Sequence, residues 1–197
     1  MSSPYTILLT VGTTKFPTLT SLFLSPHNLI SLPQHFGDSI NVILQYGGEH
    51  FESVKEKVDK GIKESGYGGR WGEGEVVLKK GSVTITINFH PYLNPLPYST
   101  SSLIITHAGA GTLLEVLPLH NKNILIVPNR ELMDDHQLEI AEVLKEKVAV
   151  YEGGEIDWSI LKAGKNGGEG KGGEVFGRIF WEEVEKSRKG GIECIII

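Results

Sequence analysis

The sequence predicts an α/β protein built on a mainly parallel sheet with helices on both faces, and two observations predict it. Several short apolar, β-branched runs are typical of strands buried on both faces, and most of them end in a glycine turn. Segments with a helical spacing of apolar residues lie between these runs, so strands and helices alternate along the chain. Ligands of such sheets bind beyond the carboxyl ends of the strands, and we expect the functional residues there.

The first two predicted strands are Tyr5–Val11 and Ile40–Tyr46. They stop at Gly12-Thr13-Thr14 and at Gly47-Gly48, which suggests parallel neighbours whose carboxyl ends share one edge. An amphipathic helix is expected over Ser53–Ser65, because its apolar residues recur every four positions.

Residues 49–81 are expected to be a glycine-rich insertion between core units. Within this insertion, Gly66–Gly74 is predicted to be a loop. The segments Glu75–Leu78 and Val83–Phe89 are expected to pair as a hairpin around Lys80-Gly81.

The alternation then resumes. Leu103–Ile105 is a predicted strand that runs into the turn and helix of Thr106–Glu115. Ile124–Val127 and Val148–Tyr151 are further predicted strands, separated by a predicted helix over His136–Lys147.

Three units follow from these patterns. Residues 1–151 are expected to form one α/β domain, and residues 152–174 a flexible linker, because the linker is rich in glycine, lysine and glutamate. Residues 175–197 combine an apolar helical face with an apolar tail. Such a helix needs a surface to dock on, either on its own domain or on a partner subunit.

Composition excludes several functional classes. The chain has 197 residues and a formal net charge of −5, which argues against general nucleic-acid binding. Its single cysteine, Cys194, excludes an internal disulfide and fits a reducing compartment. No apolar run approaches the roughly 20 residues that span a bilayer, and no secretory signal is apparent. A cytoplasmic protein without a transmembrane segment is expected.

The segment Thr106–Glu115 carries the clearest chemical pattern. In a strand, glycine turn and helix start, successive free N–H groups converge and the helix dipole favours an anion. Gly109 and Gly111 allow the backbone to approach a phosphate closely, and Thr112 adds a hydroxyl donor. This turn therefore predicts a site for a phosphorylated ligand.

Two residues narrow the identity of that ligand. Leu114 stands where a dinucleotide-binding pattern has its third glycine, which disfavours a nicotinamide enzyme without excluding it. Glu115 lies one helical turn after Gly111, so its carboxylate can face the paired hydroxyls of a ribose. The alternative is an ordinary acidic residue that complements the helix dipole.

Other polar residues follow the remaining strands. Gly12-Thr13-Thr14 is a further diphosphate contact if the sheet places it beside Gly109–Thr112. Asp134-Asp135-His136-Gln137, at a predicted helix start, offers donors and acceptors for sugar hydroxyls. Such residues are more often caps than metal ligands, so we expect no metal and no cofactor. No catalytic triad or carboxylate pair emerges; His107, which can equally be structural, and His136 are the weak candidates for a base.

Three motifs, Val11–Phe16, Thr106–Glu115 and Asn129–Ala141, together resemble a known family. The chain is similar to the soluble catalytic subunits of the eukaryotic UDP-N-acetylglucosamine transferase of asparagine-linked glycosylation, of the glycosyltransferase family 28 C-terminal-domain type. More distantly, it resembles the donor-binding half of the bacterial N-acetylglucosaminyltransferase of peptidoglycan synthesis. The resemblance implies a Rossmann-like domain that forms half of a GT-B glycosyltransferase.

The resemblance also implies a reaction and its partners. A membrane-anchored partner subunit would supply the other half and the general base. Together the two subunits would transfer N-acetylglucosamine from UDP-N-acetylglucosamine to a dolichyl-diphosphate-linked acceptor, with inversion, at the cytosolic face of the endoplasmic reticulum.

Carried over position by position, the resemblance assigns four kinds of contact to this chain. They are the diphosphate (Thr13, Thr14, Gly109, Ala110, Gly111, Thr112), the ribose (Glu115), the uracil (Phe89, His90) and the donor sugar (Asn129, His136, Gln137). The alternative to an active enzyme is a non-catalytic module that binds a nucleotide sugar or acts as a scaffold, because a protein can retain a fold without its activity.

Overall fold

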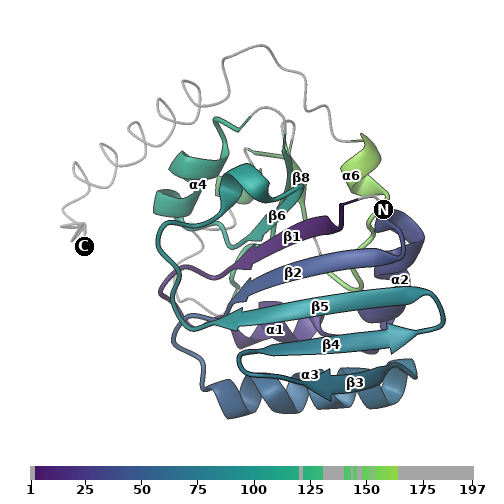
Figure 1. The fold of residues 1–197 in the computed structure, drawn as a ribbon. Helices are drawn as coiled ribbons and strands as arrows, with labels where there is room; N and C mark the ends of the chain where they lie inside the picture. The colour runs from purple at the N-terminus through teal and green to yellow at the C-terminus, as the bar shows by residue number, and fades with distance from the viewer. Residues whose placement is uncertain are drawn as a thin grey trace, which may run out of the picture.

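The computed structural model describes residues 3–119, 122–130, 140–142, 144–145, 148–151 and 153–163. They form one α/β unit around an eight-stranded sheet with the strand order β3-β4-β5-β2-β1-β6-β7-β8 (Figure 1). The α/β class and the mainly parallel sheet predicted from the sequence are therefore confirmed.

Six neighbouring strands are parallel and form the core of the sheet. β1 lies in the middle, between β2 and β6, because it is a nearly continuous apolar run with both faces covered. The six are β1 (Tyr5–Thr10), β2 (Ser39–Gln45), β5 (Val83–His90), β6 (Leu103–Thr106), β7 (Asn123–Ile126) and β8 (Ala149–Val150). Each coincides closely with a predicted strand.

Two antiparallel strands, β3 (Gly68–Trp71) and β4 (Glu75–Lys80), extend this sheet at one edge. The β4–β5 hairpin was predicted. The prediction of a loop over Gly66–Gly74 is wrong at β3, whose two glycines hide any strand pattern. A Cβ at Gly69 would lie 2.7 Å from Cδ1 of Ile62 in α3, so a larger residue here would require that side chain to shift.

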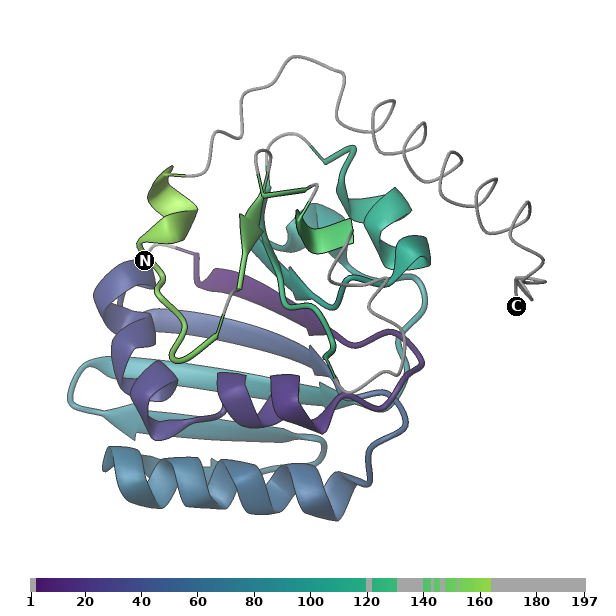
Figure 2. The same ribbon diagram turned by 180° about the vertical axis from the view of Figure 1, so that it is seen from behind.

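Three helices pack together on one face of the sheet. α1 (Pro17–Phe23), α2 (Pro26–Phe36) and α3 (Phe51–Ser65) lie together behind the sheet in Figure 1 and in front of it in Figure 2. α2 was not predicted, although Ser25 caps it by accepting a hydrogen bond from the Asn28 N–H at 3.3 Å and a proline follows the cap. On the opposite face, α4 (Ala110–Val116) covers β1, β6 and β7.

The strands therefore separate two apolar cores. Ile7 and Leu9 of β1 face the larger core under α1, α2 and α3, and α3 contributes Val54 and Val58 to it. Leu8 faces the smaller core, which it shares with α4. Alternate residues of one strand thus bury against different helices, as a strand covered on both faces requires.

The segment 153–163 closes the larger core. Ile156, Trp158 and Leu161 are buried in it, and the short helix α6 (Ile160–Ala163) follows the indole in sequence. The predicted flexible linker over 152–174 is therefore wrong for its first part, because three of its apolar side chains are buried in the larger core. The rest of that linker and the predicted helix and tail of 175–197 lie outside the described residues.

None of the helices in the described ranges is both long enough and apolar enough to cross a membrane.

Candidate functional site

Two turns that are far apart in sequence meet at the carboxyl edge of the sheet. β1 and β6 pair in parallel with Thr10 opposite Thr106, so the segments that follow them, Gly12–Thr14 and His107–Thr112, leave the edge side by side. The chain continues from β1 to β2 on one side and later returns to β6 on the other, which makes this the switch point of the sheet. Crevices at such points are the ligand sites of open α/β sheets.

The His107 ring joins these two turns. A Cβ at Gly12 would lie 3.1 Å from its Cε1, and a Cβ at Gly109 would lie 2.2 Å from its Nε2. The ring therefore fills the space that side chains at both glycines would need. It is only 6% exposed, and its Nδ1 has no hydrogen bond to any residue that the structure describes.

Burial lowers the pKa of His107 below its usual value of 6.5, and the neighbouring Thr10 backbone opposes this only in part. The neutral ring is thus favoured by folding. Its contribution to stability is complete above pH 6.5 and is lost as the pH falls through the lower, folded-state pKa.

We therefore expect the free energy of unfolding to fall when the pH is lowered from 7 to 5, and His107→Gln to flatten that dependence. Urea denaturation of both proteins across this range measures it. Equal slopes for the two proteins would show that His107 does not titrate as its burial requires.

The turn after β1 presents hydroxyl groups to solvent. Gly12 adopts a φ of +63°, and its N–H donates to Thr10 Oγ1 at 3.1 Å. Thr13 and Thr14 are exposed, and the Thr14 hydroxyl donates to the Val11 carbonyl at 2.8 Å. The predicted diphosphate residues of this turn are therefore accessible and lie next to the β6 turn.

The turn after β2 supports the β1 turn from the other side. The Gly48 N–H donates to the Thr14 carbonyl at 3.3 Å, and a Cβ at Gly47 would lie only 2.2 Å from that same oxygen. The next residue, Glu49, is 8% exposed at its side chain and pairs with Lys57 of α3. Glu49 also accepts a hydrogen bond from Thr20 Oγ1 of α1 at 2.8 Å, so two helices hold this turn in place.

The start of α4 offers backbone donors beside these hydroxyls. The Leu113 N–H makes the first bond of the helix, to the Gly109 carbonyl at 3.0 Å, so the amides of Gly109–Thr112 precede the helical ladder. Among the residues that the structure describes, a Cβ at Gly111 would meet nothing within 4 Å, so these residues leave this side of the turn open. Glu115 is exposed on the same helix and accepts a hydrogen bond from the Tyr98 hydroxyl at 2.8 Å.

The two predicted uracil residues have different environments. The Phe89 ring is 6% exposed, stacks on Trp71 at 5.6 Å between centroids and meets Phe51 edge-on at 5.7 Å. The ring packs in the larger core, so it is not available to stack on the uracil. His90, the last residue of β5, is half-buried at the carboxyl edge.

The predicted sugar residues are described only in part. Asn129 is buried just after β7, at the same edge of the sheet as the turns of β1 and β6. His136 and Gln137 lie outside the described residues. Within the described ranges, no three histidine, cysteine, aspartate or glutamate side chains are grouped so as to hold a metal ion.

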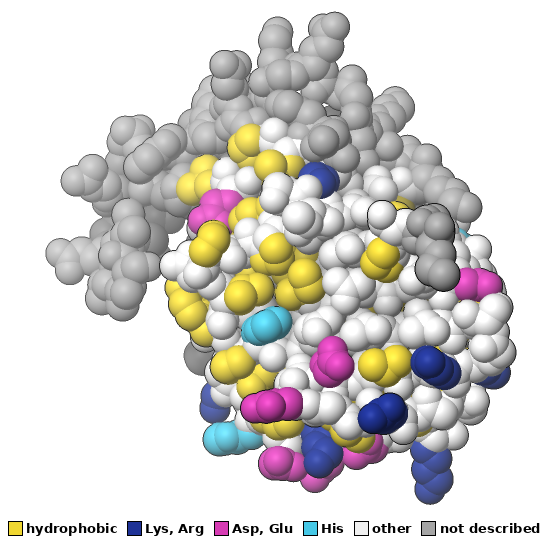
Figure 3. Space-filling model, viewed as in Figure 1, with side chains coloured by type: hydrophobic (Ala, Val, Ile, Leu, Met, Phe, Trp, Pro, Cys, Tyr) yellow, Lys and Arg dark blue, Asp and Glu magenta, His cyan; other side chains and the backbone are white. Residues whose placement is uncertain are grey.

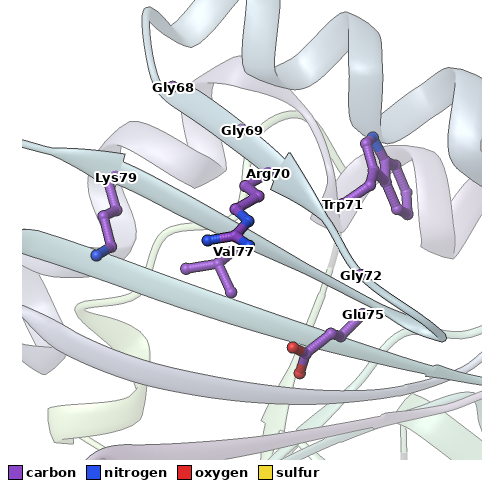
Figure 4. Close-up of a pocket in the computed structure, with 8 residues that line it drawn as sticks. All are labelled: Gly68, Gly69, Arg70, Trp71, Gly72, Glu75, Val77 and Lys79. Carbon is purple, nitrogen blue, oxygen red and sulfur yellow. The ribbon is translucent and has the colours of Figure 1, made fainter.

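A separate hollow of about 660 Å3 lies on the β3–β4 hairpin (Figure 4). Arg70, Val77 and Lys79 project from one face of these strands, whereas Trp71 points to the other. β4, β5 and β2 separate β3 from β1, so this hollow is not part of the site formed by the turns. Its lining is Gly68, Gly69, Arg70, Trp71, Gly72, Glu75, Val77 and Lys79.

Comparisons with known proteins agree on one family. The glycosyltransferase family 28 C-terminal domain matches residues 6–158. The UDP-N-acetylglucosamine transferase subunit ALG13 of Cryptococcus neoformans is 36% identical over 156 residues, which are 73% of this chain and 74% of the relative.

Two solved structures share the fold. The solution structure of ALG13 superposes with a TM-score of 0.55 at 22% identity, over 89% of this chain and 94% of that one. The crystal structure of MurG from Acinetobacter baumannii superposes with a TM-score of 0.51 at 19% identity. That match covers 93% of this chain but only 42% of MurG.

Proposed function

Because the chain belongs to the glycosyltransferase family 28 C-terminal domain family, and within it to the ALG13 subunits of UDP-N-acetylglucosamine transferases, we propose that it is the donor-binding subunit of a heteromeric inverting glycosyltransferase. The enzyme transfers N-acetylglucosamine from UDP-N-acetylglucosamine to dolichyl-diphosphate-linked N-acetylglucosamine, in the second step of lipid-linked oligosaccharide assembly. One observation carries the proposal: the turns of β1 and β6 meet at the switch point of a sheet whose residues match this family.

Each part of the donor has residues suited to it. The amides of Gly109–Thr112 and the hydroxyls of Thr13 and Thr14 hold the diphosphate and stabilise the charge that develops on the leaving UDP. The Glu115 carboxylate accepts hydrogen bonds from the ribose hydroxyls. His90 lies beside the uracil together with backbone groups, since the Phe89 ring is committed to the core.

The donor sugar and the acceptor complete the assignment. Asn129, His136 and Gln137 bind the sugar hydroxyls. A membrane-anchored partner binds the lipid-linked acceptor and supplies the base that deprotonates its hydroxyl, at the cytosolic face of the endoplasmic reticulum. The burial of His107 supports a base from elsewhere, because a ring that is 6% exposed cannot reach an acceptor in solvent.

Reconstitution tests the proposal. The purified chain should transfer N-acetylglucosamine to a lipid-linked acceptor at a rate that rises at least about 100-fold when the membrane partner is co-expressed, because the partner contributes the base. Radiolabelled transfer in membranes with each subunit alone and with both measures this rate. Full activity of the chain alone would contradict the division of labour.

Calorimetry on the same protein separates the alternatives. Binding of UDP but not NAD is expected. A nicotinamide enzyme would prefer NAD, and a non-catalytic module would bind UDP without transfer even in the presence of the partner.

A further inference from the structure

One contact at the site links residues that are 17 positions apart. The Tyr98 hydroxyl donates a hydrogen bond to Glu115 Oε2 at 2.8 Å. Tyr98 begins the short 3-10 helix η1 (Tyr98–Thr100) in the connection before β6, and Glu115 belongs to α4, which follows β6. Strand β6 therefore brings the two together, and the proposed ribose ligand does not stand alone.

The Tyr98 side chain is held in place by packing and by backbone hydrogen bonds, whereas the Glu115 side chain is exposed to solvent. The Tyr98 ring is half-buried and packs against the smaller core. The backbone N–H of Tyr98 donates to the Leu96 carbonyl at 2.9 Å, and its backbone carbonyl accepts from the N–H of the buried Ser101 at 3.3 Å. Glu115 is exposed, and an exposed glutamate otherwise samples many rotamers.

The phenol also keeps its proton. Burial, and then the hydrogen bond with Glu115, raises the pKa of Tyr98 well above its usual value of 10.0. Its hydroxyl is therefore a donor at every physiological pH. A carboxylate has about four acceptor positions, so a bond from Tyr98 to one oxygen leaves positions for a pair of vicinal hydroxyls.

We propose that Tyr98 is a positioning residue that fixes the Glu115 carboxylate in the orientation needed to accept both ribose hydroxyls, and that it thereby contributes to selection for a ribonucleotide. This inference rests on the proposed donor site. It predicts that loss of the Tyr98 hydroxyl weakens ribose recognition without touching the nucleotide directly.

The test compares two ligands on three variants of the full chain. Calorimetry with UDP and with 2′,3′-dideoxy-UDP measures how strongly each protein discriminates a ribose. Tyr98→Phe retains the ring packing and should weaken UDP binding about 3- to 10-fold, as expected for one hydrogen bond, with unchanged affinity for the dideoxy ligand. Glu115→Ala should remove the discrimination, and the double variant should lose nothing more.

Tyr92→Phe is the matched control. Tyr92 lies in the same connection and is 59% exposed, and within the described part of the chain its hydroxyl makes no hydrogen bond. Hydrophobic side chains gather on the face of the molecule that carries α4 (Figure 3). Because the Tyr92 side chain is exposed, loss of its hydroxyl controls for a general change in surface polarity. Its ligand discrimination should equal that of the unmodified protein.

The outcomes separate the inference from the function on which it rests. If Glu115→Ala loses discrimination while Tyr98→Phe keeps it, the positioning role of Tyr98 is wrong and the donor site stands. If Glu115→Ala discriminates as before, or the unmodified chain binds no UDP, the ribose assignment itself fails and the role of Tyr98 fails with it.

Discussion

Replacing Gly109 with alanine is expected to lower transfer by about 100-fold, the effect of a misplacement of roughly 1 Å at a reacting centre. The new Cβ would lie 2.2 Å from His107 Nε2, 2.8 Å from its Cε1 and 2.9 Å from its Cδ2. The His107 ring is buried between the two turns and only 6% exposed, so it has little room to move away. The turn that carries the proposed diphosphate contacts must shift instead.

Gly111→Ala, two residues later, is the matched control. A Cβ there meets no atom of the described ranges within 4 Å, and Gly111 lies in α4, where alanine is the better helix former by about 1 kcal/mol. Urea denaturation should therefore show lower stability for Gly109→Ala and equal or higher stability for Gly111→Ala. Any loss of transfer in Gly111→Ala then reports the approach of the ligand alone. Equal stability and transfer in Gly109→Ala and the unmodified protein would refute the contact with His107.

Trp158→Ala is expected to cost about 3–5 kcal/mol of unfolding free energy, as for other buried large-to-small changes. The Trp158 side chain is 2% exposed and meets Phe23 and Phe36 edge-on, at 6.5 and 5.5 Å between ring centroids. Its Nε1 donates to Ser31 Oγ at 3.0 Å, so α1 and α2 would both lose contacts. Chemical denaturation followed by circular dichroism measures the loss.

Ser31→Ala isolates the polar part of this interaction. This variant leaves the indole in place and removes one buried hydrogen bond. The free energy of unfolding is expected to fall by about 1–3 kcal/mol, because Trp158 Nε1 then has no acceptor. A Trp158→Ala protein with an unchanged denaturation midpoint would show that residues 153–163 do not belong to the folded unit.

The strands were predictable because burial on both faces leaves a nearly continuous apolar run. Tyr5–Thr10 and Leu103–Thr106 are such runs, and the bounds of both strands were predicted to within one or two residues. β3 was not, since Gly68 and Gly69 carry no side chains to form a pattern. Trp158 was missed for a related reason: its neighbours are glycine-rich, and composition averaged over such a window conceals one large anchor.

The candidate site was also predictable only in part. The positions of its backbone turns follow from the order of strand, turn and helix in the sequence, and the pairing of Thr10 with Thr106 brings the two predicted turns together. The side-chain contacts at the site could not be predicted. The packing of His107 between two glycines and the bond from Tyr98 to Glu115 depend on tertiary positions that no local spacing encodes. Phe89 shows the converse, because the family resemblance assigned it to the uracil although its ring packs in the larger core.

The central position of β1 has a consequence for synthesis. β1 leaves the ribosome well before one of its two neighbours in the sheet, β6, which begins only at Leu103. Until that strand emerges, the β1 backbone from Ile7 to Thr10 has one unpaired edge, and Trp158 closes the larger core later still. Nascent chains that stall between these points expose strand edge and apolar surface, so they are the forms on which chaperones are expected to act.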